Sequence, residues 1–127
     1  MPVINIKSLP VRDRINIPEI LVRLNQSVAN VSGIDPEHVW SYWEFIKSGF
    51  YAVGKNIAAS VHEQTHSPII RVTCLEGKTT EQIKIILETI AATISRELDI
   101  EYGNMFIVYD NIDPAMVFDG GLGVQIK

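Results

Sequence analysis

An internal repeat is the feature of this sequence that most restricts its fold. The segment PVINIKSLPVR begins at Pro2, and PIIRVTCLEGK begins at Pro68, 66 positions later. In both segments a proline opens a run of alternating apolar and polar residues, which is typical of a half-buried β-strand. Each segment has a cation ten residues after its proline, Arg12 in the first and Lys78 in the second. The chain of 127 residues is therefore predicted to contain two copies of one structural unit.

A helix is predicted after each of these strands. In the second copy, Thr79 and Gln82 form a capping-box pair at the start of an apolar stripe with helical spacing. In the first copy, Pro18 suits the first turn of a helix, and Gly33 suits its C-terminal cap. The stripes consist of Ile20, Leu21, Leu24, Val28 and Val31 in the first copy and of Ile83, Ile86, Leu87, Ile90, Ile94 and Leu98 in the second.

Each helix leads into another apolar segment, HVWSYWEFI or NMFIVYD, and then into a stretch that contains glycine. Each copy is thus predicted as β-α-β with a short closing hairpin. The copies span residues 2–54 and 67–127 of a single domain, 1–127, and a linker at 55–66 joins them. Because β-α-β crossovers make parallel strand pairs, the predicted fold class is α+β, a four-stranded mixed sheet with two helices on one face. We expect the other face, which still carries apolar side chains, to be buried in an oligomer.

The composition excludes several classes of function. A net charge of −4, without a cluster of Lys or Arg, argues against a nucleic-acid partner. No apolar run approaches the length of a membrane span, and the segment MPVINIKSLP lacks the pattern of a signal peptide. Cys74 is the only cysteine, so intramolecular disulfides are impossible and a reducing compartment is expected. These features predict a cytoplasmic protein without a membrane partner.

The stretch HEQTH, from His62 to His66, fits the zinc-peptidase pattern H-E-x-x-H. Such a site requires both histidines on one face of an intact helix, with a further ligand downstream. The Ser67-Pro68 pair disfavours a helix that continues past His66, and the remaining histidine, His38, lies upstream. The favoured interpretation is a polar linker without a metal, and a zinc peptidase is kept as a remote alternative.

Pro2 is the residue with the most distinctive chemistry. If Met1 is removed, as is usual when the second residue is small, Pro2 carries a free secondary amine. An α-amine has a pKa of about 7.7–8.0, which burial or a nearby cation lowers. Such an amine, fixed at the start of a strand, can act as a general base for a proton next to a carbonyl. The alternative is a proline that only opens a strand, where its nitrogen needs no partner.

The arrangement resembles the tautomerase superfamily. In the second copy, PIIRVTCLEGKTTEQ and AATISRELD are similar to 4-oxalocrotonate tautomerase over strand, turn, capping box and helix. The doubled layout is similar to the long-chain members, the malonate semialdehyde decarboxylases and cis-3-chloroacrylic acid dehalogenases. The resemblance covers nearly the whole chain. It implies the tautomerase or MIF-like fold, a homotrimer, and catalysis by an N-terminal proline without a cofactor.

The resemblance also implies roles for particular residues. Pro2 matches the catalytic proline, which requires that Met1 is removed. Arg12 matches the arginine that binds a substrate carboxylate, and Lys78 holds the equivalent place in the second copy. Phe50 and Tyr51 are the best matches to the hydrophobic wall of the family's pocket.

Two features depart from the family pattern. The second active-site arginine of the short-chain tautomerases falls near Ser41 in the first copy and at Phe106 in the second, and neither is cationic. No residue clearly matches the carboxylate with which the decarboxylases and dehalogenases activate water. The candidates by position are Asp35, Glu44, Asp110 and Asp119.

The predicted function is a proline-based tautomerase or isomerase that transfers a proton between keto and enol forms of a small carboxylated substrate. Two alternatives remain open. One is a decarboxylase, or a hydratase or dehalogenase, on the same scaffold. The other is a non-catalytic trimer that binds a small acid or a partner.

Overall fold

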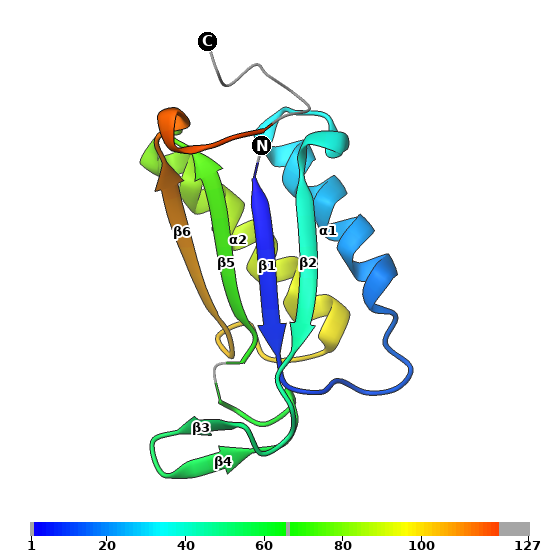
Figure 1. The fold of residues 1–127 in the computed structure, drawn as a ribbon. Helices are drawn as coiled ribbons and strands as arrows, with labels where there is room; N and C mark the ends of the chain where they lie inside the picture. Colours follow the sequence, from blue (N-terminus) through cyan, green and yellow to red (C-terminus); the bar gives the residue numbers. More distant parts are fainter. Residues whose placement is uncertain (1, 66, 120–127) are drawn as a thin grey trace.

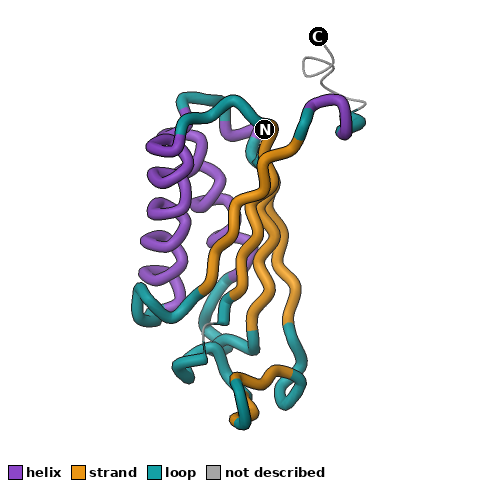
Figure 2. The backbone as a smooth tube through the Cα atoms, turned by 90° about the vertical axis from the view of Figure 1, so that its left-hand side faces the viewer, coloured by secondary structure: helices purple, strands orange, loops and turns teal. Residues whose placement is uncertain are grey.

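Two helices cover one face of a four-stranded sheet, and the other face is open (Figures 1 and 2). The computed structural model describes residues 2–65 and 67–119. The strands of the sheet, in the order β2-β1-β5-β6, are β1 (Val3–Ser8), β2 (Trp40–Phe45), β5 (Ile69–Leu75) and β6 (Phe106–Ile112). The helices are α1 (Ile17–Ser32) and α2 (Thr80–Leu98). The predicted mixed sheet with two helices on one face is confirmed.

The two copies follow the same hydrogen-bonding pattern. β1 pairs in parallel with β2, and β5 pairs in parallel with β6. The Trp40 N–H donates to the Pro2 carbonyl at 3.0 Å, and the Phe106 N–H donates to the Pro68 carbonyl at the same distance. Each proline therefore lies directly before its strand, beside the first residue of the parallel partner. The repeat read from the sequence is a structural repeat.

The central strands β1 and β5 are antiparallel, which gives the sheet two distinct ends. The end that holds Pro2, called the Pro2 end below, also holds the C-terminal ends of β5 and β6 (Figure 1). The opposite end, called the Arg12 end, holds the C-terminal ends of β1 and β2 and the β3–β4 hairpin (Figure 1). The bounds of the hairpin strands are Tyr51–Val53 and Asn56–Ala58. β1 alone separates the two ends by about 20 Å, because a strand rises about 3.3 Å per residue.

Both helices begin where the sequence predicted, and α1 also ends at the predicted Gly33. The Thr79 side chain accepts from the Gln82 N–H, and the Gln82 side chain accepts from the Thr79 N–H, which completes the capping box of α2. Asn16 caps the start of α1, and Gly33 ends it with a positive φ of 69°. At that φ a side chain would be strained, so glycine suits this position.

The core lies between the sheet and the helices. Its buried residues include Ile4, Ile6, Ile70 and Val72 from the sheet, Ile20, Leu24 and Val28 from α1, and Ile86, Ile90, Ile94 and Leu98 from α2. Val31, which the apolar stripe assigned to the core, lies in the last turn of α1 and is 42% exposed. The stripe therefore extends one turn beyond the part of α1 that packs on the sheet.

The open face of the sheet is mixed in character. Its residues, assigned from strand register and alternation, are Trp40, Tyr42 and Glu44, Val3, Asn5 and Lys7, Ile69, Arg71 and Thr73, and Phe106, Val108 and Asp110. Arg71 forms an ion pair with Asp110 across β5 and β6 at 2.5 Å. Aromatic residues at both edges remain exposed, with Phe106 at 58% and Tyr42 at 49%.

The connection between the copies and the final segment add three details. β4 lies within the range predicted as linker, so the hairpin of the first copy extends to Ala58. After β6 the chain forms the short helix η2 (Pro114–Met116), and the predicted glycine-rich closing stretch at 120–123 lies outside the described residues. Within 2–65 and 67–119, none of the helices is both long and apolar enough to cross a membrane.

Candidate active site

Pro2 is held rigidly at the head of the central strand. Its side chain is buried, and its carbonyl accepts the Trp40 N–H. The next residue, Val3, pairs with Trp40 of β2 on one side and with Thr73 of β5 on the other. A nitrogen at this point is therefore fixed by strands on both sides, which is the placement a general base requires.

Lys78 lies at the same end of the sheet as Pro2. It follows β5 in the loop that leads to the N-terminus of α2. The Glu76 N–H donates to the Ile112 carbonyl at 3.0 Å, which ties this loop to the end of β6. Gly77, with φ at 128°, makes the turn directly before Lys78. The loop thus presents a cation at the end of the sheet where a prolyl amine would lie.

The HEQTH segment does not form a helix over its described residues, because residues 61–65 lie in turns. The Glu63 carboxylate accepts the N–H groups of Ala59 and Ser60, both at 2.8 Å, and these bonds hold its pKa below the ordinary value. His66 lies outside the described residues. Within 2–65 and 67–119, no group of three or more His, Cys, Asp or Glu residues could hold a metal ion. The segment is a folded connection between the two copies, and its glutamate, Glu63, is bound to backbone N–H groups of that connection.

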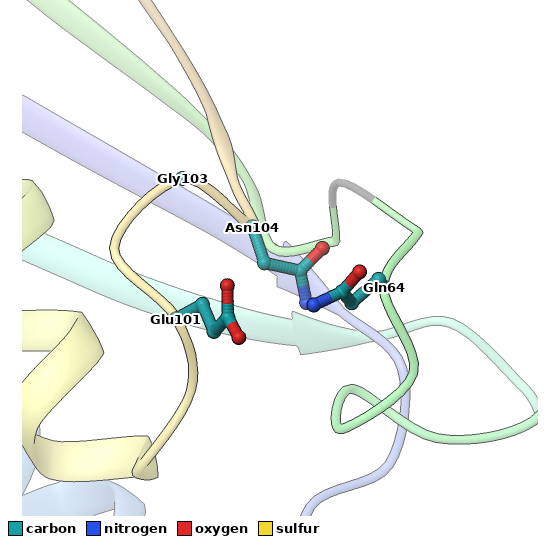
Figure 3. Close-up of a pocket in the computed structure, with 4 residues that line it drawn as sticks. All are labelled: Gln64, Glu101, Gly103 and Asn104. Carbon is teal, nitrogen blue, oxygen red and sulfur yellow. The ribbon is translucent and has the colours of Figure 1, made fainter.

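A polar hollow of about 280 Å³ lies between this segment and the loop from α2 to β6. Figure 3 shows Gln64 on one side and Glu101, Gly103 and Asn104 on the other. The Asn104 amide donates to the carbonyls of Val61 and Glu63, at 3.4 and 3.0 Å. These bonds fasten the connection to the second copy.

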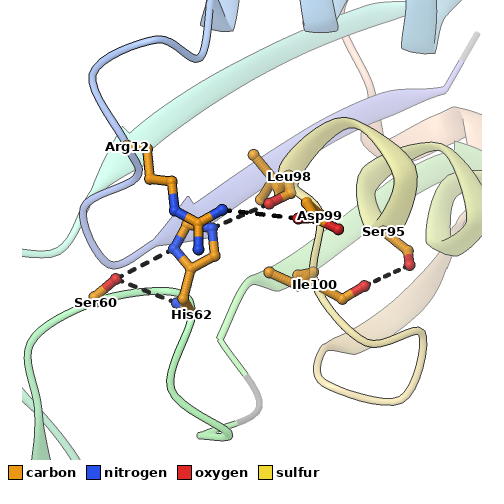
Figure 4. Close-up of polar contacts among 7 residues, drawn as sticks. All are labelled: Arg12, Ser60, His62, Ser95, Leu98, Asp99 and Ile100. Atoms are coloured by element: carbon orange, nitrogen blue, oxygen red, sulfur yellow. Dashed lines mark hydrogen bonds and ion pairs between the residues drawn. The ribbon is translucent and has the colours of Figure 1, made fainter.

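Arg12 lies at the opposite end of the sheet from Pro2. Its guanidinium forms an ion pair with Asp99 at 3.8 Å, and both side chains are largely exposed. Asp99 caps α2 with a positive φ of 55°. Beside this pair the His62 imidazole makes a hydrogen bond with the Leu98 carbonyl at 3.1 Å (Figure 4). Arg12 and Lys78 are therefore separated by the length of the sheet.

Phe50 and Tyr51 also lie at the Arg12 end, at the start of the β3–β4 hairpin. Phe50 is 71% exposed, and the Lys47 ammonium lies over its ring, 5.1 Å from the ring centre, in a cation–π contact. The Tyr51 hydroxyl donates to the Thr65 carbonyl at 2.5 Å, which fastens the hairpin to the connection. Within one chain, the structure places Pro2 and Lys78 at the same end of the sheet and Arg12, Phe50 and Tyr51 at the other end.

Comparison with known proteins identifies the architecture. No family model matches the sequence, and no curated protein matches it. Among solved structures, a wild-type fused 4-OT described as an asymmetric trimer superposes with a TM-score of 0.80, at 19% identity over 94% of this chain and 93% of the other. The chain has the fused 4-OT fold. A protein inactivated by 2-oxo-3-pentynoate gives a TM-score of 0.80, at 16% identity over 94% and 92%. A member of the cis-3-chloroacrylic acid dehalogenase family gives 0.73, at 13% identity over 94% and 80%. The fold implied by the sequence resemblance is confirmed.

The carboxylates that are candidates for water activation by position alone, each otherwise interpreted as a cap or a surface charge, have structural partners in this chain. Asp35 accepts the Glu37 N–H at 2.9 Å and caps a short helix, η1 (Pro36–His38). Glu44 accepts the Asn5 side-chain amide at 3.0 Å on the open face. The Asp110 carboxylate holds Arg71, whose pKa it raises. Asp119 is 9% exposed and is the last of the described residues.

Sequence reasoning missed the division of the site residues between two ends. It grouped Arg12 with Lys78 because each lies ten positions after its proline. The signal that separates them is the orientation of the two central strands, which the spacing of residues does not carry. His38 ends η1, one residue before β2 begins at Trp40, and so also lies at the Pro2 end.

Proposed function

We propose that this chain is a proline-based tautomerase that acts on a small carboxylated keto or enol acid. One observation carries the proposal. Pro2 is buried at the head of a central strand of the fused 4-OT fold, and Lys78 lies at the same end of the sheet. The inactivation of a structural neighbour by 2-oxo-3-pentynoate supports a 2-oxo acid as the class of substrate.

The proposed mechanism needs removal of Met1, which leaves Pro2 with a free secondary amine. The amine takes a proton from carbon or from an enol hydroxyl and returns it to a different carbon. The Lys78 ammonium holds the substrate carboxylate, and its charge favours the neutral form of the nearby amine. Charge that develops on the enolate oxygen lies close to the same cation, which lowers the barrier to proton transfer.

An oligomer is part of the proposal. The open face carries exposed aromatic residues, and three fused 4-OT structures are described as trimers. We therefore assign the chain to a homotrimer with the sheets inward, and sedimentation that shows a stable monomer would contradict this. Phe50 and Tyr51 could reach a prolyl site only from another copy. Because the Tyr51 hydroxyl is already bound to Thr65, the proposed catalytic set is limited to Pro2 and Lys78.

The test is a keto–enol assay on phenylenolpyruvate and 2-hydroxymuconate. Pro2→Ala should lower kcat, since it keeps an amine but loses the rigid ring. Lys78→Ala should lower kcat/KM about ten- to a hundredfold, the loss of a charge-assisted contact of about 1.5–3 kcal/mol. Lys78→Arg should restore part of that loss. Lys84→Ala, an equal change of charge at an exposed position on α2, is the matched control and should match wild type.

The form that retains Met1 decides the role of the amine, because its Pro2 nitrogen is an amide. Full activity in that form would exclude the prolyl amine as the base. The mass of the mature chain from its natural host tests the same point: a chain that begins at Pro2 supports catalysis, and one that keeps Met1 supports the non-catalytic binding trimer.

A hydratase or dehalogenase on this scaffold is the second candidate. The observation that favours it is the structural neighbour from the cis-3-chloroacrylic acid dehalogenase family. Release of chloride from cis-3-chloroacrylate by the purified protein would select this reaction over tautomerisation.

A further inference from the structure

We propose that Cys74 and Tyr109 are positioning residues for the prolyl amine of Pro2. The Cys74 sulfur accepts the N–H of the amine and thereby directs the nitrogen lone pair away from the core, while the Tyr109 hydroxyl holds the thiol in place. The proposal rests on the proposed tautomerase, since it concerns how the general base of that enzyme is held. It is carried by the register of the strands, by burial, and by the surroundings of the Tyr109 hydroxyl.

β5 carries Cys74 directly across from Pro2. In the antiparallel pair of β1 and β5, Val3 lies opposite Thr73, and one further step of the same register brings Pro2 opposite Cys74. Figure 1 shows the N-terminus beside the end of β5. Residues that face each other in an antiparallel pair have Cα atoms about 4.5–5.5 Å apart. Cys74 is therefore the cross-strand neighbour of Pro2.

The side chains of Pro2, Cys74 and Tyr109 lie on the face of the sheet that the helices cover. Pro2 is buried and continues the buried positions of β1, which alternate along the strand and include Ile4. Cys74 is 3% exposed and continues the buried positions of β5, which include Val72. Tyr109 packs against the core cluster. Bulk water is thus largely kept from the thiol.

Tyr109 is the neighbour of Cys74 on the other side. It lies opposite Val72 in the parallel pair of β5 and β6, one step along the same face. Its hydroxyl oxygen is buried and makes no hydrogen bond of ordinary geometry with residues 2–65 and 67–119. Burial and the neighbouring Cys74 thiol raise the pKa of Tyr109, so the phenol keeps its proton at neutral pH. A thiol is both a weak donor and a weak acceptor, so its sulfur can contact the phenol and the amine together.

The thiol gives the amine a defined orientation. A neutral secondary amine has one N–H and one lone pair. When the Cys74 sulfur accepts that N–H, the lone pair points away from the covered face and is free to take a proton from the substrate. The ammonium that results has two N–H groups, of which one returns its proton to the substrate and the other stays on the sulfur. Because a hydrogen bond to the charged form favours that form, the thiol also raises the pKa of the amine.

Other titratable and charged groups at the Pro2 end contribute to the field at the amine. On the open face, Asp110 is paired with Arg71. The remaining groups come from η1 and its cap, from the loop after β5 with the start of α2, and from the segment after β6. They are Asp35, Glu37 and His38, Glu76, Lys78 and Glu81, and Asp113 and Asp119. Variants at positions 74 and 109 leave all of them in place, so a comparison among these variants isolates the thiol and the phenol.

The test is an NMR titration of the amine in the full chain, labelled with ¹⁵N-proline and shown by its mass to begin at Pro2. Cys74→Ala removes the acceptor and should lower the amine pKa by about half a unit to one unit. Cys74→Ser supplies a stronger acceptor and should give an amine pKa above that of Cys74→Ala. Cys74→Val fills the space of the thiol without a polar atom and should match Cys74→Ala, which separates hydrogen bonding from packing.

Tyr109→Phe tests the second step, because it removes only the hydroxyl. It should lower the amine pKa by less than Cys74→Ala does, and it should add nothing when combined with Cys74→Ala, since the phenol acts through the thiol. In the keto–enol assay, the acidic limb of the kcat/KM profile should move with the amine pKa of each variant.

Thr73→Ala is the matched control, since it removes a small polar group from the adjacent position of β5 on the open face. It should leave the amine pKa unchanged. The proposal is overturned by an unchanged amine pKa in Cys74→Ala and Cys74→Val, by an equal shift in Thr73→Ala, or by a full additional shift when Tyr109→Phe is combined with Cys74→Ala. The titration needs no turnover. An inactive chain whose amine shifts as expected would contradict the tautomerase alone, and an active chain without the shifts would contradict the positioning alone.

Discussion

Ser67 offers the sharpest test of how the two copies are joined. The Leu9 N–H, at the end of β1, donates to the Ser67 hydroxyl at 3.1 Å. Both residues are completely buried, at 0% exposure. This bond fastens the connection between the copies to the first strand, directly before Pro68 and β5. Ser67→Ala removes the acceptor and leaves the rest of the chain unchanged.

The expected cost follows from the burial. Water cannot reach the Leu9 N–H, so the variant leaves a buried donor without a partner, which costs about 1–3 kcal/mol. The loss of one oxygen adds only a small packing term. We therefore expect Ser67→Ala to lower the free energy of unfolding by about 1–3 kcal/mol. Ser48→Ala, in the exposed turn before Phe50, is the control and should stay within about 0.5 kcal/mol of wild type.

Urea denaturation followed by tryptophan fluorescence measures the change. Trp43 is a suitable reporter, because its indole N–H donates to the Ser8 hydroxyl at 2.9 Å, next to Leu9. All variants must be compared at one chain concentration, since the stability of an oligomer depends on it. A Ser67→Ala variant as stable as the Ser48→Ala control would refute the reasoning, because the buried N–H would then have found another acceptor or water.

Two further predictions concern the helices. Thr79→Ala removes half of the capping box and should lower the free energy of unfolding by about 1 kcal/mol in urea denaturation, whereas Thr79→Ser should recover most of it. Arg23 makes two hydrogen bonds with Glu97, at 2.8 and 2.7 Å, and these hydrogen bonds hold the pKa of the Glu97 carboxyl below its ordinary value. A carboxyl with a lowered folded pKa stabilises the fold above its unfolded pKa, and this contribution is lost as the pH falls through the folded pKa. Arg23→Ala should therefore be less stable than wild type at neutral pH, and the difference should shrink as the pH falls through the folded pKa of Glu97. Denaturation curves whose difference stays the same throughout acid titration would contradict this.

Local signals in the sequence predicted much of the fold. The capping pair Thr79 and Gln82 and the helix end at Gly33 are set by short-range hydrogen bonds and backbone conformation, and the structure has all of them. The repeat predicted two parallel pairs, since a β-α-β crossover leaves little choice. Residue spacing could not predict at which end of the sheet Arg12 and Lys78 lie. Their placement depends on the antiparallel pairing of β1 with β5, which are distant in the sequence.

The candidate site was predicted less completely, for a related reason. The sequence placed Tyr51 near a pocket, but it could not show that the Tyr51 hydroxyl bonds to Thr65, because that contact depends on how the hairpin folds back. A surface hollow beside Arg12 likewise combines Phe45, at the end of β2, with Ile17, at the start of α1. Such neighbours come together only through tertiary packing.

The doubling of the unit itself explains why its two ends can differ. A chain has one N-terminus, so only one of two equivalent strand starts can bear a prolyl amine. The antiparallel β1 and β5 place that start at the end of the sheet that holds Lys78 rather than Arg12. Lysine is a compact charge on a flexible stem, so Lys78 would hold a substrate carboxylate as a point charge and without the bidentate fork of arginine. Arginine is a planar fork that fits a carboxylate whose geometry does not change. The two ends of one chain therefore differ both in the cation that each presents and in whether its proline could carry an amine.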